Sequence, residues 1–135
     1  MGTQSNQVAT ESQIQSAFVE WCRRSEKKYP ALKLAFSVPN GAWTKNYAMA
    51  AKLKREGMRP GVPDWMMPHS SKISIDERNL AVKFKHGLAI EFKRPGGKCT
   101  TIQLAYHKLL MQGGWQVEVC SDWQVARQIV EEYLG

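Results

Sequence analysis

Residues 88–93, with the sequence Leu-Ala-Ile-Glu-Phe-Lys, constrain the fold more strongly than any other part of the chain. They form an apolar run interrupted by one carboxylate, with Gly87 before it and a Pro-Gly-Gly turn shortly after it. Such a run between turn residues predicts a strand in a buried sheet. Because strand side chains alternate between the two faces, we expect Glu91 and Lys93 on one face and Phe92 on the other.

Hydrophobic spacing and capping residues predict the other elements. Helices are expected over residues 10–28, 43–56, 103–112 and 122–133, and strands over residues 32–38, 65–67 and 115–120. Residues 69–79 are polar and predict a loop or an insertion, after which residues 80–85 and 87–93 are expected to pair as two strands. The resulting order of helix, strand, helix, three strands, helix, strand and helix predicts an α/β fold, with a central mixed sheet flanked by helices.

Length and charge limit the domain count and the kind of partner. The chain has 135 residues, of which 43% are hydrophobic, so we expect one domain over residues 1–135, with residues 1–9 as a flexible N-terminal segment. Nineteen Lys and Arg against 12 Asp and Glu give a net charge of +7. This excess favours a polyanionic partner, with nucleic acid as the first candidate; a basic protein without such a partner is the alternative.

The cysteines and the apolar segments bear on the cellular compartment. Cys22, Cys99 and Cys120 are far apart in sequence, which indicates neither a disulfide framework nor a zinc site and favours reduced thiols. No apolar run approaches the ~20 residues that a membrane span requires. We therefore expect a cytoplasmic protein without a membrane partner.

A second carboxylate stands at the start of the strand over residues 65–67, where Asp64 follows Pro63. Asp64 and Glu91, with the backbone carbonyl of Phe92, form an oxygen ligand set suited to Mg²⁺ or Mn²⁺, and such a cation activates water for phosphodiester hydrolysis. Lys93 could orient or deprotonate that water, or neutralise charge in the transition state. The alternative is a solvated Glu–Lys pair without a catalytic role, but a carboxylate in a buried strand needs a partner.

Several motifs, in order along the chain, resemble the VRR-NUC branch of the PD-(D/E)XK nuclease superfamily. They are Glu11-Ser12-Gln13-Ile14-Gln15, Pro39-Asn40-Gly41, Gly57, Gly61-Val62-Pro63-Asp64, Ile90-Glu91-Phe92-Lys93, Lys98, Gln103 and Gly114. The valine-arginine-arginine motif of the family name is absent, because the matching segment is Glu91-Phe92-Lys93-Arg94. The resemblance implies a restriction-endonuclease-like fold and a structure-selective endodeoxyribonuclease similar to the Holliday junction resolvases. It also implies a homodimer acting on branched DNA, in a bacterial or phage-infected cell.

The same resemblance implies further site residues. An acidic residue of the first helix would complete the metal site, and Glu11 matches the family position better than its rival Glu20. Glu11 could instead be a capping residue that interacts with the helix dipole. Gln103 would bind the scissile phosphate or a metal-bound water, whereas we expect His107 on the same helix to be structural.

Basic residues near both motifs are candidates for contacts with DNA phosphates. They are Lys45, Lys52, Lys54, Arg55 and Arg59 before Asp64, and Arg94 and Lys98 after Glu91. Trp43 and Tyr47 could stack on exposed bases or belong to the core or a dimer contact. Two other functions stay open: a catalytically silent DNA-binding module that retains the nuclease fold, and a restriction-type enzyme, although the chain offers no target-recognition segment.

Overall fold

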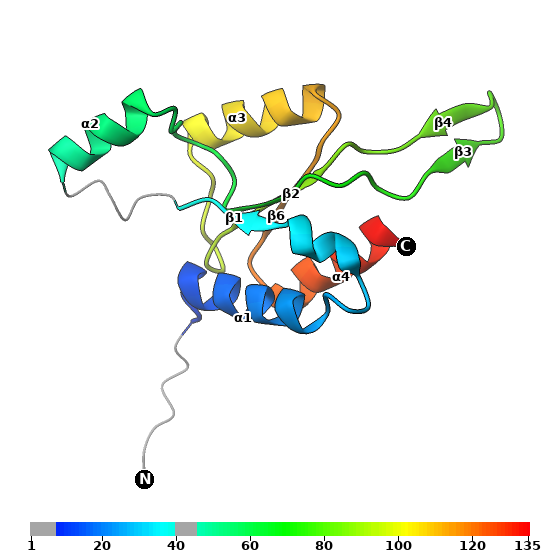
Figure 1. Cartoon of the computed structure of the whole chain (residues 1–135), viewed down its shortest axis with the longest axis horizontal. Helices are drawn as coiled ribbons and strands as arrows, with labels where there is room; N and C mark the ends of the chain where they lie inside the picture. Colours follow the sequence, from blue (N-terminus) through cyan, green and yellow to red (C-terminus); the bar gives the residue numbers. More distant parts are fainter. Residues whose placement is uncertain (1–7, 40–45) are drawn as a thin grey trace, which may run out of the picture.

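The computed structural model describes residues 8–39 and 46–135. It contains four α-helices, a 3₁₀ helix and a central sheet, and a separate hairpin projects from the body (Figure 1). The helices are α1 (Glu11–Arg24), η1 (Pro30–Leu34), α2 (Tyr47–Arg55), α3 (Thr101–Gln112) and α4 (Trp123–Leu134). Most of the expected N-terminal segment 1–9 lies outside the described residues.

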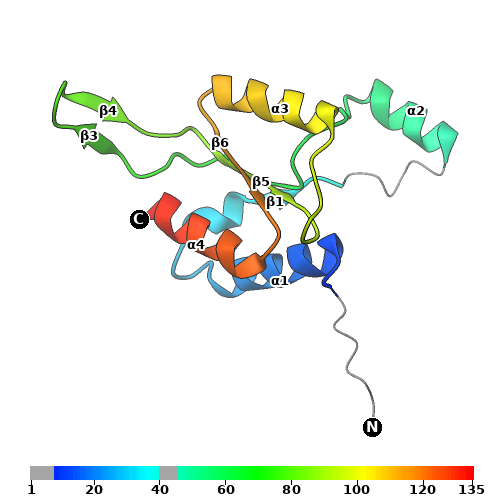
Figure 2. The same cartoon turned by 180° about the vertical axis from the view of Figure 1, so that it is seen from behind.

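The central sheet is mixed, as predicted. Its strand order is β1-β2-β5-β6, with β1 at Phe36–Ser37, β2 at Trp65–Met67, β5 at Leu88–Phe92 and β6 at Gln116–Cys120. β1, β2 and β5 pair antiparallel, whereas β5 and β6 pair parallel. Helices α1 and α4 cover one face of this sheet and α3 lies over the other (Figures 1 and 2). Every residue of β5 is buried, so the prediction of an interior strand is confirmed.

The predictions for residues 69–85 are wrong in two respects. A strand, β3 (Ser74–Asp76), lies within the expected loop, and β4 (Ala81–Lys83) pairs with β3 rather than with residues 87–93. The hydrogen-bonding edges of β5 are already taken by β2 and β6, so β4 has no place beside it. Residues 74–83, between β2 and β5, therefore form a two-stranded hairpin outside the central sheet.

The expected strand over residues 32–38 is also largely wrong. Residues 30–34 form η1, which begins at Pro30, and only Phe36 and Ser37 are extended and paired in β1. Proline favours the first helical position because its fixed φ suits a helix and its missing N–H is not needed there. The predicted second helix is present as α2, capped by Asn46, and residues 43–45 of that prediction lie outside the described residues.

An aromatic cluster joins α1 to the sheet. The Phe18 ring lies 5.0 Å from that of Trp65 on β2 and 5.4 Å from that of Phe92 on β5. All three side chains are fully buried, which stabilises the packing of β2 and β5 on α1. No helix in the described part of the chain is long and apolar enough to cross a membrane, and the three cysteines are free thiols.

Candidate metal centre

The pairing of β2 with β5 brings Asp64 to Glu91. Trp65 lies opposite Ile90, so the residue that precedes β2 meets the residue that follows Ile90. The Asp64 N–H donates to Glu91 Oε2 at 3.2 Å, and the Phe92 N–H donates to Asp64 Oδ2 at 2.8 Å. The Asp64 carbonyl also accepts from the Val38 N–H at 2.8 Å. The Asp64 N–H thus orients the Glu91 carboxylate, and the Phe92 N–H orients the Asp64 carboxylate.

Lys93 lies on the same strand face as Glu91, as predicted. Its Nζ is 3.7 Å from Glu91 Oε1, and the two side chains are 11% and 1% exposed. Phe92 points to the opposite face, into the aromatic cluster with Phe18. This alternation places the charged pair on the side away from α1.

Gln103 approaches Glu91 from the first turn of α3. Thr100 caps that helix through its hydroxyl, and the Gln103 side-chain oxygen accepts from the Thr100 N–H at 2.9 Å. The other end of the same amide donates a hydrogen bond to Glu91 Oε1. The amide therefore links the start of α3 to Glu91, whereas its expected contact with a phosphate or a bound water stays a prediction.

The Glu91 carboxyl group is in an environment that disfavours its charged form. Burial raises its pKa to about 8, the neighbouring Asp64 carboxyl adds to this rise, and the Lys93 charge opposes it. A divalent cation would supply the positive charge that Lys93 provides only in part. The residues present therefore fit Mg²⁺ or Mn²⁺, which would be held by Asp64, Glu91 and the Phe92 carbonyl.

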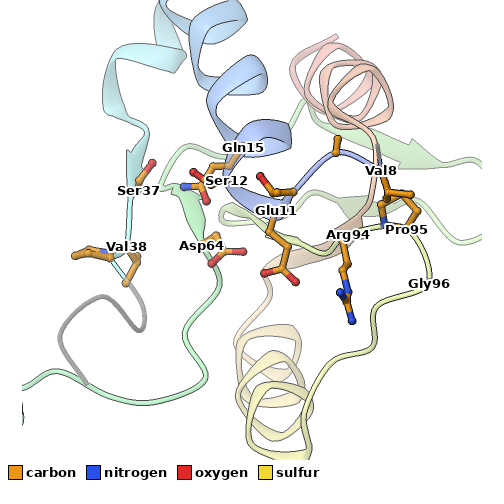
Figure 3. Close-up of a pocket in the computed structure, with 13 residues that line it drawn as sticks. Val8, Glu11, Ser12, Gln15, Ser37, Val38, Asp64, Arg94, Pro95 and Gly96 are labelled. Carbon is orange, nitrogen blue, oxygen red and sulfur yellow. The ribbon is translucent and has the colours of Figure 1, made fainter. Parts of the chain in front are cut away.

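A broad cleft opens beside Asp64, with a volume of about 1340 Å³. The N-terminal turn of α1, the end of β1 and residues 94–96 line it, and Figure 3 shows Glu11 and Arg94 pointing into this space. Glu20 lies outside the cleft and lines a smaller pocket with Arg23. The structure therefore brings Glu11, and not its rival Glu20, to the cleft of Asp64.

Glu11 does not form a compact three-carboxylate centre with Asp64 and Glu91. Within residues 8–39 and 46–135, no group of three or more His, Cys, Asp or Glu side chains is arranged to hold a metal ion. The two-carboxylate set would thus be completed by backbone, water and substrate oxygens, as is common for Mg²⁺. The role of Glu11 as a metal ligand stays a prediction.

Two residues near the site were not expected there. Gln15 and Ser37 line the cleft. Gln15 is four residues after Glu11, and this helical spacing is a signal that could have located it. Ser37 carries no such signal, because its position depends on the pairing of β1 with Trp65.

Cys99 and His107 also lie within reach of the charges of the site. Burial raises the pKa of Cys99, with Lys93 opposing this and Glu91, Asp64 and Glu11 adding to it. His107 is buried, as a structural residue should be, and its pKa is lowered by burial and by the Lys93 charge. Among the described residues its Nε2 has no hydrogen-bond partner.

The sequence matches no family model and no curated protein. Among solved structures it is similar to one titled "VRR_NUC domain protein", with a TM-score of 0.68 and 23% sequence identity. The likeness covers 94% of this chain and 89% of the other. The chain has the VRR-NUC fold. This confirms the predicted fold class.

The VRR-NUC fold distributes the candidate DNA-binding residues unevenly. Arg94 lies in the cleft, and Lys98 is exposed on the same loop. Lys52, Lys54 and Arg55 are exposed on α2, a helix without a buried residue that lies apart from the sheet (Figure 1). Arg59 lines a separate groove beside α3 rather than the cleft. Trp43 and Lys45 lie outside the described residues.

Proposed function

We propose that this protein is a Mg²⁺- or Mn²⁺-dependent nuclease. The proposal depends most on one observation: Asp64 and Glu91 share a hydrogen-bonded, largely buried site with Lys93 beside them, at the edge of a cleft that contains Arg94. Two carboxyl groups held this close in a buried site cannot both carry a charge at low cost unless a cation is bound, so the pair favours a divalent metal. The neighbour's title, "VRR_NUC domain protein", supports the same activity.

Each residue of the centre has a physical role in such a reaction. Asp64 and Glu91 would hold the cation, which when bound polarises the phosphate and lowers the pKa of a water. Lys93, as an ammonium group, would stabilise negative charge that develops on the phosphoryl oxygens. Gln103 positions Glu91 through its amide N–H, and the Thr100 cap positions Gln103.

The preferred substrate in this proposal is branched DNA, with the four-way junction first. The net charge of +7 supports a nucleic acid partner. Arg94 in the cleft, Lys98 on the same loop and the exposed basic residues of α2 offer phosphate contacts that do not depend on base sequence. Resolution of a four-way junction needs two symmetric cuts, which a homodimer with two centres would make.

Cleavage of labelled four-way junctions, flaps and plain duplex with Mg²⁺, Mn²⁺ or chelator tests this proposal. We expect cleavage only with metal, fastest on the junction, and a loss of at least about 100-fold in Glu91→Gln and Asp64→Asn. Glu20→Gln is the matched control, because Glu20 is an exposed carboxylate outside the cleft. Undiminished cleavage by Glu91→Gln, or no cleavage of any substrate by the unaltered chain, would reject it. Metal-independent junction binding without cleavage would favour the silent DNA-binding module.

A further inference from the structure

The β3–β4 hairpin has one apolar and one polar face. Ile75 pairs with Val82, and Ile73 and Phe84 are each two residues away, so these four side chains share one face. They are between 44% and 69% exposed. On the other face Ser74 pairs with Lys83, whose Nζ is 3.4 Å from Asp76 Oδ2.

Such a hairpin lacks the packing that usually stabilises it. An isolated two-stranded sheet is marginal in water, and a hydrophobic face normally requires a covering layer. Figures 1 and 2 show β3 and β4 extending beyond the body of the molecule, past the C-terminal end of α3. The four apolar side chains therefore form a ridge that stays largely exposed among the described residues, with Phe84 in ring contact with His86 at its base.

A second uncovered apolar surface begins where the hairpin joins the body. The His86 ring contacts the Phe84 ring edge-on, with the ring centroids 5.0 Å apart. The backbone N–H of His86 donates to the Gly114 carbonyl at 2.9 Å. From there a groove of about 580 Å³ follows α3, lined among others by Ile102, Ala105, Leu109 and Trp115. Ridge and groove thus adjoin at the base of the hairpin.

We propose that the hairpin of one copy docks in the α3 groove of a second copy, reciprocally, to form a two-fold dimer. The lengths agree: residues 71–76 span about 20 Å as extended chain, and the 12 residues of α3 span about 18 Å. A two-fold axis at the hairpin base, near His86 and Gly114, places each ridge along the other copy's α3. In such an isologous pair, the hairpin of each copy binds the α3 groove of the other, so the same contact is made twice.

This pairing deepens the homodimer of the proposed function, and it has a consequence for the site. The hairpin leaves the body at the C-terminal end of α3, so its tip would reach the N-terminal end of α3 in the other copy. That end carries Ile102 and Gln103, and Gln103 contacts Glu91. The exposed Arg78 at the tip would then lie near the second copy's metal centre, where it could contact the same DNA.

Sedimentation velocity without metal or DNA tests the dimer independently of nuclease activity. We expect the unaltered chain to sediment at twice its 15.3 kDa mass at micromolar concentration. Ile75→Glu on the ridge and Leu109→Glu in the groove should each weaken self-association at least about 100-fold, because each buries an unpaired charge. Ser74→Glu, on the polar face of the same strand, and Leu104→Glu, on α3 outside the groove, are matched controls that should leave the dimer unchanged.

The outcomes distinguish this dimer from a monomer, from a dimer with another interface, and from a failure of the proposed nuclease activity. A chain that stays monomeric, or a dimer that survives both substitutions, overturns it. Dissociation by Ile75→Glu but not by Leu109→Glu overturns the groove as the docking site. Glu91→Gln should abolish cleavage and leave the dimer intact, so a failed dimer and a failed nuclease are distinguishable.

Discussion

At the scale of single residues, the centre depends on a carboxylate that the fold disfavours in its charged form. Glu91 is 1% exposed and lies beside Asp64, and its counterion is Lys93, whose Nζ is 3.7 Å from Glu91 Oε1. Gln103 and the Asp64 N–H donate to its two oxygens. Such an arrangement would favour the proposed metal ion, at some cost to the stability of the protein without it.

Metal-free protein should lose stability as pH rises from 4.5 to 8. The pKa of Glu91 is raised from 4.5 to about 8, so between these values the unfolded chain has released a proton that the folded chain retains. The stabilisation is complete below the unfolded pKa and is lost as pH rises through the folded pKa. Urea titrations of metal-free protein over this range measure it, and Glu91→Gln should flatten the profile. Equal slopes in both proteins would contradict the prediction.

Gln103 should influence metal affinity through Glu91. In Gln103→Leu the donor to Glu91 is lost and no charge is added, so the charged form of Glu91 loses a hydrogen bond and its pKa rises further. We expect Mn²⁺ binding at neutral pH to weaken about tenfold, measured by calorimetry. Gln112→Leu at the far end of α3 is the control. Unchanged affinity in Gln103→Leu would show that the amide does not act on the centre.

At the scale of elements, the loop before Asp64 and the start of α3 are in direct backbone contact. Gly61 has φ of +87°, and a Cβ there would lie 2.7 Å from the Ile102 carbonyl oxygen. Gly57 has φ of +106° with nothing within 4 Å. Both glycines permit a left-handed turn, but only Gly61 also allows close approach.

Gly61→Ala should therefore destabilise the protein more than Gly57→Ala. Both substitutions cost about 1 kcal/mol for the left-handed backbone, and Gly61→Ala adds a steric clash of roughly 1–3 kcal/mol. Urea denaturation of the two variants measures the difference. We also expect weaker metal binding in Gly61→Ala only, since the displaced elements carry Asp64 and Gln103. Equal stability of the two variants would contradict the close contact.

At the scale of the whole molecule, the net positive charge and the cationic Arg94 side chain in the cleft would make different contributions to the proposed DNA binding. Arg94 lies in the cleft beside Asp64, whereas Lys27 is exposed beyond the end of α1. Phosphate contacts release counterions, so their number sets the salt dependence of the affinity. General charge instead steers association at long range.

Arg94→Ala should reduce the slope of log affinity against log salt by about 1 for junction DNA, whereas Lys27→Ala should leave it nearly unchanged. Fluorescence anisotropy at several salt concentrations, with Ca²⁺ replacing the catalytic metal, gives both slopes. Equal slopes for the two variants would show that binding follows total charge rather than the cleft.

The sequence alone determined those features that depend on local spacing. The alternation in residues 88–93 was sufficient to place Glu91 and Lys93 on one buried face, and the capping residues located three helices to within a few positions. The tertiary structure decided which strands are neighbours, because β5 accepts β2 and β6 and so excludes β4. It also decided that Glu11 rather than Glu20 meets the cleft and that Gln103 binds Glu91. Local propensity acts over a few residues, whereas contacts between residues far apart in sequence are set by how the elements pack.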